Sequence, residues 1–210
     1  MYDLEEQEQI DALKAWWRQY GKWVMTGCMV GIFGFVGIKG WDTYQKRQAE
    51  AAGKLLEAVR VAARTGDAPK TLVAARVLQS QYDTSPLAAR GALIAAAVSH
   101  VRGDDKDAEG ELQWVILHST EPPMGNLARL RLAGLWADQK KYDAALHLLT
   151  DEKTPEFAAL TLDLKGDILL AMNRLPEARV AYKQATEKSQ PMDALHQLDQ
   201  TKWEALGGER

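Results

Sequence analysis

The sequence has few cysteines and histidines, the residues that form disulfides and most zinc sites. It contains one cysteine, Cys28, and four histidines among 210 residues. A lone cysteine cannot form a disulfide within the chain, and no cysteine pair or cysteine–histidine cluster has the spacing of a zinc site. The histidines are 18, 29 and 49 residues apart, and each is expected to be an exposed or half-buried helix residue: His100, His118, His147 and His196. We therefore predict no metal site.

The chain also lacks an excess of positive charge and the motifs of common enzymes. Its 26 lysines and arginines are outnumbered by 29 acidic residues, so the net charge is -3 and no broad basic field is available for nucleic acid. The serine-elbow and Walker patterns are absent, and so is the dinucleotide-binding glycine pattern outside the apolar stretch described below. We predict no catalytic residues, no cofactor and no nucleic-acid partner, which leaves a non-enzymatic, protein-binding role.

One acidic run is similar to the opening of a calcium-binding loop. Asp105, Asp107 and Glu109 alternate along the chain and are followed by Gly110. The twelfth position of such a loop requires a bidentate glutamate, and here it is Ile116. We interpret the run as the start of a helix, where acidic side chains lie near the positive end of the helix dipole.

Long hydrophobic runs are absent except for one stretch near the N-terminus. Between Lys22 and Lys39 lie sixteen residues without a charge, WVMTGCMVGIFGFVGI. As a helix they would rise about 24 Å, which is short of the roughly 30 Å hydrocarbon core of a bilayer. The two lysines can extend their charged ends outward, so the usable span becomes Tyr20 to Tyr44. We predict a membrane helix over residues 20–44.

Aromatic residues and glycines near this stretch support the membrane interpretation. Two groups of aromatic residues are placed like the belts of a membrane helix: Trp16, Trp17, Tyr20 and Trp23 before the apolar stretch, and Trp41 and Tyr44 after it. A packing face of Gly27, Gly31 and Gly34 would suit helix association, although membrane compatibility alone explains these glycines as well. The alternative is a helix buried in a soluble core, which six glycines between positions 21 and 40 disfavour.

The N-terminus predicts an anchor that stays on the protein, and the lysines and arginines leave its orientation open. Five acidic residues precede the apolar stretch, which is unlike a cleaved signal peptide. Basic residues flank both ends of the stretch in similar numbers, so the positive-inside rule does not decide which end faces the cytoplasm.

The remainder of the sequence predicts an all-α fold. Alanine, leucine, glutamine, lysine and glutamate are abundant, several prolines stand at natural helix starts, and no stretch alternates with the period of a strand. Helix periodicity and turn residues predict helices over residues 42–64, 69–82, 86–101, 106–118, 125–139, 142–150, 155–172, 176–188 and 192–206.

Three segments repeat a pattern of small, large and turn residues. Two copies are 33 residues apart: Ala133, Trp136, Lys140, Tyr142, Ala145 and Leu149, then Gly166, Leu169, Asn173, Leu175, Ala178 and Tyr182. An earlier copy, 37 residues before the first of these, is Ala96, Ser99, Gly103, Ala108 and Leu112. Small residues on both helices of a hairpin allow close packing, and stacked hairpins bury the apolar faces that a single hairpin leaves exposed. The pattern resembles tetratricopeptide repeats, although the first hairpin, residues 42–82, fits it poorly, and a generic helical bundle is the alternative.

Three consecutive segments near the N-terminus are EQEQIDALKAWWRQYGKW, the glycine-rich span, and GWDTYQKRQAEAA. With these segments and the layout of one N-terminal anchor followed by a tetratricopeptide-like remainder, essentially the full chain resembles the YfgM-like family of ancillary subunits of the bacterial SecYEG translocon. The resemblance implies a cytoplasmic tail over residues 1–19, a single inner-membrane pass over 20–44, and a periplasmic tetratricopeptide-like domain over 45–206. It also implies that the partners are the SecYEG channel and a PpiD-type periplasmic chaperone, to which exported chains would be passed.

These observations lead to two functional hypotheses. The first is an adaptor at the translocon, whose partner-binding concave face would include, from the tetratricopeptide positions, Arg90, Leu93, His100, Leu127, Leu130 and Leu160. The second is an envelope scaffold, unrelated to export, that forms homo-oligomers through the glycine face. Crosslinking through Cys28 would distinguish them, because a strong homodimer product favours the scaffold.

Overall fold

The structure is a computed structural model that describes residues 2–151 and 155–208. Side chains are described throughout these ranges except at positions 2–9, 11, 12, 30, 32, 34, 36, 37 and 151. The chain divides into two compact units, of which the first ends at Glu50 and the second begins at Ala51. Each unit is described below by itself.

The fold is all-α, as the composition predicts, and the described residues contain no strand. Its elements in chain order are α1 (Tyr2–Arg64), α2 (Ala68–Gln81), α3 (Pro86–Val101), α4 (Asp105–His118), α5 (Pro122–Asp138), α6 (Tyr142–Leu148), the 3-10 helices η1 (Leu149–Asp151) and η2 (Pro155–Phe157), α7 (Ala158–Ala171), α8 (Leu175–Lys188) and α9 (Ala194–Ala205). From α2 to α9 these bounds follow the predicted ranges closely. The start of α5 differs, because Pro122 and Pro123 occupy first-turn positions where a helix needs no N–H donor.

The first unit consists of helix α1 up to Glu50, and most of the large apolar side chains that the structure describes there are exposed. Trp23, Phe33 and Ile38 are 78%, 73% and 72% exposed. Within the part of the chain that the structure describes, no helix has both the length and the apolar character needed to cross a membrane. The predicted membrane helix over 20–44 is not confirmed, and several positions of its apolar run, Gly34 among them, lie outside the described side chains.

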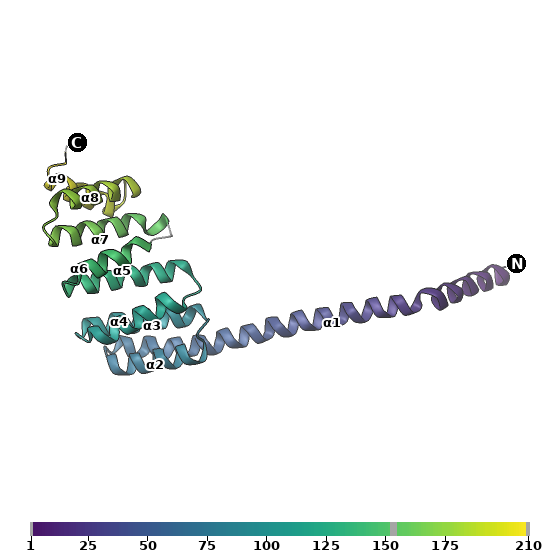
Figure 1. Cartoon of the computed structure of the whole chain (residues 1–210). Helices are drawn as coiled ribbons and strands as arrows, with labels where there is room; N and C mark the ends of the chain where they lie inside the picture. The colour runs from purple at the N-terminus through teal and green to yellow at the C-terminus, as the bar shows by residue number, and fades with distance from the viewer. Residues whose placement is uncertain (1, 152–154, 209–210) are drawn as a thin grey trace. The chain divides into compact units, whose positions relative to one another are not determined.

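The second unit is a succession of helical hairpins closed by a single helix (Figure 1). We number the hairpins from 1 to 4: residues 51–64 of α1 with α2, α3 with α4, α5 with α6, and α7 with α8. Consecutive hairpins contact each other through α2 and α3, through α4 and α5, and through α5 and α7, while α9 packs on α8. Buried apolar clusters fill the spaces between neighbouring hairpins, so the core is continuous along the stack.

The two helices of every hairpin are joined by the same backbone turn. One residue in each turn has a positive φ: Gly66, Gly103, Lys140 and Asn173. Its N–H donates to the carbonyl three residues earlier, and the next N–H donates to the carbonyl five residues earlier, as in Gly103 to His100 and Asp104 to Ser99, both at 2.9 Å. This is the Schellman motif, which satisfies carbonyl groups at the end of a helix. The predicted turn positions Gly103, Lys140 and Asn173 are therefore confirmed.

The packing confirms the repeat and extends it to the first hairpin. The paired small residues of hairpins 2, 3 and 4 are all buried: Ala96 with Ala108, Ala133 with Ala145, and Gly166 with Ala178. Hairpin 1 uses Val59 and Thr71 at the equivalent positions, both 0% exposed, and its turn residue Gly66 is 37 residues before Gly103. Hairpin 1 therefore fits the small-residue pattern poorly, as predicted, because its paired side chains are larger. Its turn and its register are nevertheless the same as in the other hairpins.

Candidate functional site

The predicted binding residues occupy equivalent positions on the first helices of hairpins 2 to 4, but in different surroundings. Counting from the buried residues Ala96, Ala133 and Gly166, we define the groove face as the positions six and three residues before these and one, four and five residues after them. The six predicted residues lie at these positions: Arg90, Leu93, His100, Leu127, Leu130 and Leu160. Their burial determines which of them a partner can reach.

The structure encloses three of these residues partly or fully and leaves three exposed. Leu93 is 6% exposed and belongs to the core between hairpins 2 and 3. Leu127 and Leu130 are half-buried and pack on the clusters on either side of α5. Arg90 is exposed and lies 3.9 Å from Glu121 in a loose ion pair, and Leu160 is 39% exposed.

His100 is the one predicted residue that lines a cavity between hairpins 2 and 3. The cavity has a volume of about 350 Å³ and lies among α3, α4 and α5. Its walls are small or apolar side chains: Ala96, Ala97, Val101, Ala108, Leu112, Gly134 and Leu135. Val101 is 84% exposed even though it is apolar, so its side chain is available to another molecule. Such a cavity fits one or two aliphatic side chains and offers little to a polar ligand.

Three polar residues complete the lining of this cavity. They are His100, Arg131 and Asp138, contributed by the first helices of hairpins 2 and 3. The ring nitrogen Nδ1 of His100 lies 2.8 Å from Oδ1 of Asp105, so the first turn of α4 holds this side chain in place. An apolar pocket with a few polar side chains around it is the usual composition of a site that binds peptide segments.

Gly134 gives this cavity its width. A Cβ added at Gly134 would meet no atom within 4 Å, so the space beside its backbone is open. The equivalent residue of hairpin 2 is Ala97, and that of hairpin 4 is Asp167. The sequence analysis did not identify Val101, Arg131 or Gly134 as site residues. The repeat register could have found Val101 and Gly134, because both fall on the groove face.

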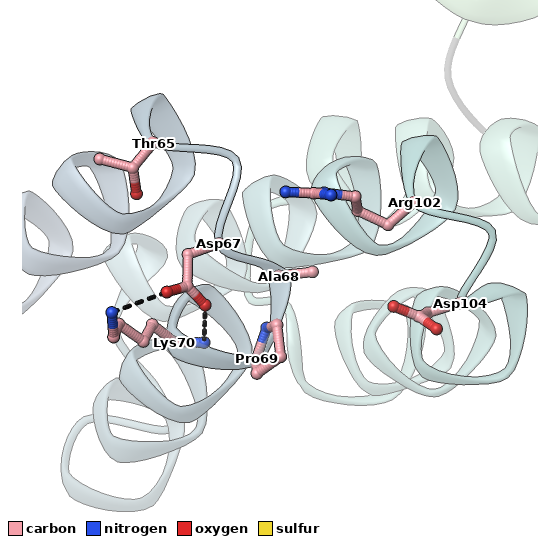
Figure 2. A pocket seen from close by; sticks show the side chains of 7 residues that line it. All are labelled: Thr65, Asp67, Ala68, Pro69, Lys70, Arg102 and Asp104. Atoms are coloured by element: carbon pink, nitrogen blue, oxygen red, sulfur yellow. Dashed lines mark hydrogen bonds and ion pairs between the residues drawn. The ribbon is translucent and has the colours of Figure 1, made fainter.

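A second cavity, of about 570 Å³, lies beside the turns of hairpins 1 and 2 (Figure 2). Asp67 accepts a hydrogen bond from the backbone N–H of Lys70 at 3.0 Å and lies 2.8 Å from its ammonium group, as the dashed lines show. The hydrogen bonds to Lys70 lower the pKa of Asp67. Arg102 donates from Nε and Nη2 to the Gly66 carbonyl at 2.9 and 2.6 Å, which ties the two turns together. The charged groups of Asp67, Lys70 and Arg102 are already bonded to one another or to the backbone, so we assign this cavity a structural role.

The acidic run and the glycine face, the remaining features singled out in the sequence, do not form a binding site with other described side chains. The described residues include no group of three or more histidine, cysteine or acidic side chains that could hold a metal ion. Asp105 and Asp107 are in the first turn of α4, as predicted for the acidic run. Open space lies beside Gly27 and Gly31, while Gly34 is among the side chains that the structure leaves undescribed.

Stacked hairpins with one repeated turn and one repeated small-residue pair define the class of tetratricopeptide-like helical repeat proteins. The family model for the tetratricopeptide repeat-like domain matches residues 14–208. The chain is 35% identical over 210 residues to a protein of Neisseria gonorrhoeae, covering 97% of this chain and 98% of the relative. It is 26% identical over 200 residues to a protein of Escherichia coli, with 94% of each chain covered. Both relatives are named ancillary SecYEG translocon subunit, and the chain belongs to this family, as the YfgM-like resemblance predicted.

Proposed function

We propose that this chain is an adaptor of the SecYEG translocon that binds segments of partner proteins on its groove face. The observation that carries the translocon assignment is the similarity to ancillary SecYEG translocon subunits along nearly the whole chain. The cavity among α3, α4 and α5 supports a binding role, because it is open, apolar and lined by an exposed valine. Exported chains are unfolded when they emerge, so their aliphatic side chains are suitable ligands for such a cavity.

The adaptor is held in the inner membrane by a helix over residues 20–44. Tyr20 and Trp41 are separated by about 31 Å along a helix, which is close to the thickness of the hydrocarbon core. The hydroxyl of Thr26 donates to the Lys22 carbonyl at 2.8 Å, so this polar group is satisfied within the helix. Exposed apolar side chains in this segment gain by contact with lipid. In this proposal residues 1–19 are cytoplasmic, and residues 45–206 form the periplasmic domain.

Thiol labelling tests the anchor and its orientation. In a Cys28→Ser background, Ile10→Cys and Met192→Cys each place one thiol at a position that is exposed in the structure. We expect a membrane-impermeant maleimide to label position 192 in spheroplasts, and position 10 only after the membrane is opened. Extraction of the protein by alkaline carbonate, or labelling of position 10 in closed spheroplasts, would contradict the proposed topology.

A pair of matched substitutions tests the binding surface. Val101→Asp introduces a charge beside the cavity, and we expect it to reduce recovery of translocon or exported chain with the purified protein by about tenfold, since an unpaired charge is costly in an apolar contact. Val180→Asp makes the same change at an exposed valine on α8, away from the groove face. Its recovery of partners should match the wild type. Equal recovery from both variants would show that the cavity is not the binding surface.

The choice of partners is the finer part of the proposal. We propose that a PpiD-type periplasmic chaperone receives the exported chain from the groove face. Photocrosslinking from position 101 during export tests this order, with adducts to exported chains expected before adducts to the chaperone. The alternative is an envelope scaffold that self-associates through Gly27, Gly31 and Gly34. A dominant homodimer crosslink through Cys28, with no translocon recovered, would favour that scaffold over the adaptor.

A further inference from the structure

The last hairpin and α9 meet in a cluster of charged side chains that the proposed function leaves unused. The Nζ of Lys202 on α9 lies 2.5 Å from Asp163 and 2.8 Å from Asp167, two carboxylates one turn apart on α7. The hydroxyl of Tyr182 on α8 donates to Asp167 at 2.8 Å. A third carboxylate, Asp199, stands three residues before Lys202 on α9. Three helices therefore bring three carboxyl groups, one ammonium group and one phenol together.

Asp199 is the unusual member of this cluster. It is 0% exposed, and neither of its carboxylate oxygens has a hydrogen-bond partner. The polar group that can bond to it is the carboxyl group of Asp163, which when ionised is an acceptor like Asp199 itself. Two carboxylates form a hydrogen bond only when one of them carries a proton. A buried ionised carboxylate without a donor is costly, so the geometry favours a shared proton.

The charged groups around Asp199 do not balance its negative charge when it is ionised. From α7 it faces Asp163 and Asp167, from α8 the uncharged phenol of Tyr182, and from α9 the ammonium group of Lys202. Lys202 is already bonded to both α7 carboxylates. Burial and Asp167 raise the pKa of Tyr182, so the phenol stays neutral and adds no charge. One ammonium group therefore faces three carboxylates unless a proton is bound.

We propose that the Asp163–Asp199 carboxyl pair is a proton-binding site that couples pH to the docking of α9 on the last hairpin. With the proton bound, the two carboxyl groups share a hydrogen bond and Lys202 balances the remaining charge. Without it, Asp199 is a buried anion that repels α7. The docked position of α9 is then less favourable than an undocked one in which Asp199 is hydrated.

Undocking would expose an apolar surface. Trp203 and Leu206 at the end of α9 pack on the core cluster of hairpin 4, which contains Leu169, Ala178, Ala181 and Tyr182. Moving α9 away uncovers this cluster at the end of the stack, on the side where a further hairpin would continue it. The proton site thus controls whether the stack is closed or presents a new apolar face.

The direction of the pH effect follows from the pKa of Asp199. Burial, the largest cause, and the neighbouring carboxyl group of Asp163 raise this pKa from 3.8 to about 7. A raised pKa means that the docked state holds its proton more tightly than the undocked state. The equilibrium constant for docking of α9 is therefore largest below about pH 4. It falls by about tenfold per pH unit as the pH rises from about 4 to 7, and it is smallest and constant above about pH 7.

Hydrogen exchange on the full chain in mild detergent tests the site. We expect the protection factors of α9 amides, corrected for intrinsic exchange rates, to fall by about tenfold per unit between pH 5 and pH 7. Asp199→Asn keeps the size of the side chain and supplies a permanent donor to Asp163, so its α9 should stay protected across this range. Asp193→Asn is the matched control, because Asp193 is exposed at the start of α9 and should leave the wild-type slope unchanged.

Two outcomes would overturn the proposal. One is a pH slope that Asp199→Asn leaves intact, and the other is an α9 that is equally protected in the wild type from pH 5 to pH 7. Lys202→Met supplies a second measurement if Asp199→Asn fails to fold. Loss of the ammonium group favours proton binding in the docked state, so the pH above which the protection of α9 stops falling should move upward from about 7. A downward move of this pH would contradict the site.

Discussion

The middle and the end of the helical stack place different side chains at equivalent positions. One residue after the buried small residue stands Ala97 in hairpin 2 and Gly134 in hairpin 3, but Asp167 in hairpin 4. The middle positions border an open apolar cavity, whereas Asp167 is bonded to Tyr182 and Lys202. The repeated backbone fixes where these side chains lie, and their chemistry decides whether the surface is open or closed.

The start and the end of the stack also differ in the hydrogen-bond partners of a buried carboxylate. Glu111 on α4 is 3% exposed, but it accepts hydrogen bonds from Gln79 and from Arg76, both on α2. Asp199 at the end of the stack has no such donor. The buried carboxylate of Glu111 joins hairpins 1 and 2 through its two hydrogen-bond donors. A buried carboxylate without donors depends on a proton, so hairpin contacts near the start of the stack should respond less to pH than the contact of α9.

The same glycine substitution should have opposite effects in the two regions. A Cβ at Gly166 would collide with the buried ring of Tyr182, so Gly166→Ala should lower the free energy of unfolding by about 3 kcal/mol. Gly134→Ala adds its methyl group to open space in a helix and should raise the free energy of unfolding by about 1 kcal/mol. Urea denaturation of the full chain, followed by circular dichroism, measures both. Losses of equal size would show that the middle of the stack is as tightly packed as its end.

A second substitution tests whether donors account for the difference between the two buried carboxylates. Gln79→Ala removes a donor from Glu111 and should cost about 2 kcal/mol at pH 7. Burial already raises the pKa of Glu111, and loss of the amide raises it further. Because the folded state then binds a proton more tightly than the unfolded state, the loss should shrink as the pH falls toward 5.

Gln113→Ala is the matched control for this substitution. Gln113 donates to Glu109 at 3.1 Å on the exposed surface of α4. The substitution therefore removes a glutamine–glutamate hydrogen bond of the same kind, but one that is not buried. The loss should be a few tenths of a kcal/mol and independent of pH. A Gln79→Ala loss that stays constant from pH 5 to pH 7 would contradict the account of Glu111.

Helices and turns could be predicted from the sequence because their causes are local. Prolines at several helix starts and residues such as Gly103 at turns are local signals that mark where many of the helices from α2 to α9 begin and end. The register of hairpin 1 was missed because Val59 and Thr71 stand where the later hairpins have alanine or glycine. Gly66 lies 37 residues before Gly103, the same spacing as between Gly103 and Lys140. The turn residue therefore indicates the register better than the sizes of the paired side chains do.

The candidate site was predictable only in part, since a cavity depends on three helices at once. The repeat positions correctly placed His100 beside it, but they also selected Leu93, which neighbouring hairpins enclose. The repeat position alone does not distinguish these two residues, because both lie on the groove face of α3. The cluster around Asp199 was not foreseen, since its members come from α7, α8 and α9 and no local motif joins them.

The turns provide the finest test of the comparison between the middle and the end of the stack. Lys140 in hairpin 3 and Asn173 in hairpin 4 have φ values of 60° and 59°, which L-residues other than asparagine and aspartate rarely adopt. Lys140→Gly should therefore raise the free energy of unfolding by about 1 kcal/mol. Asn173→Gly should change it by only a few tenths, because asparagine tolerates this conformation. Denaturant midpoints compared at equal slopes measure the difference. If both glycine substitutions stabilised the chain equally, the backbone strain would be the same in both turns. Hairpins 3 and 4 would then differ only in the side chains around them.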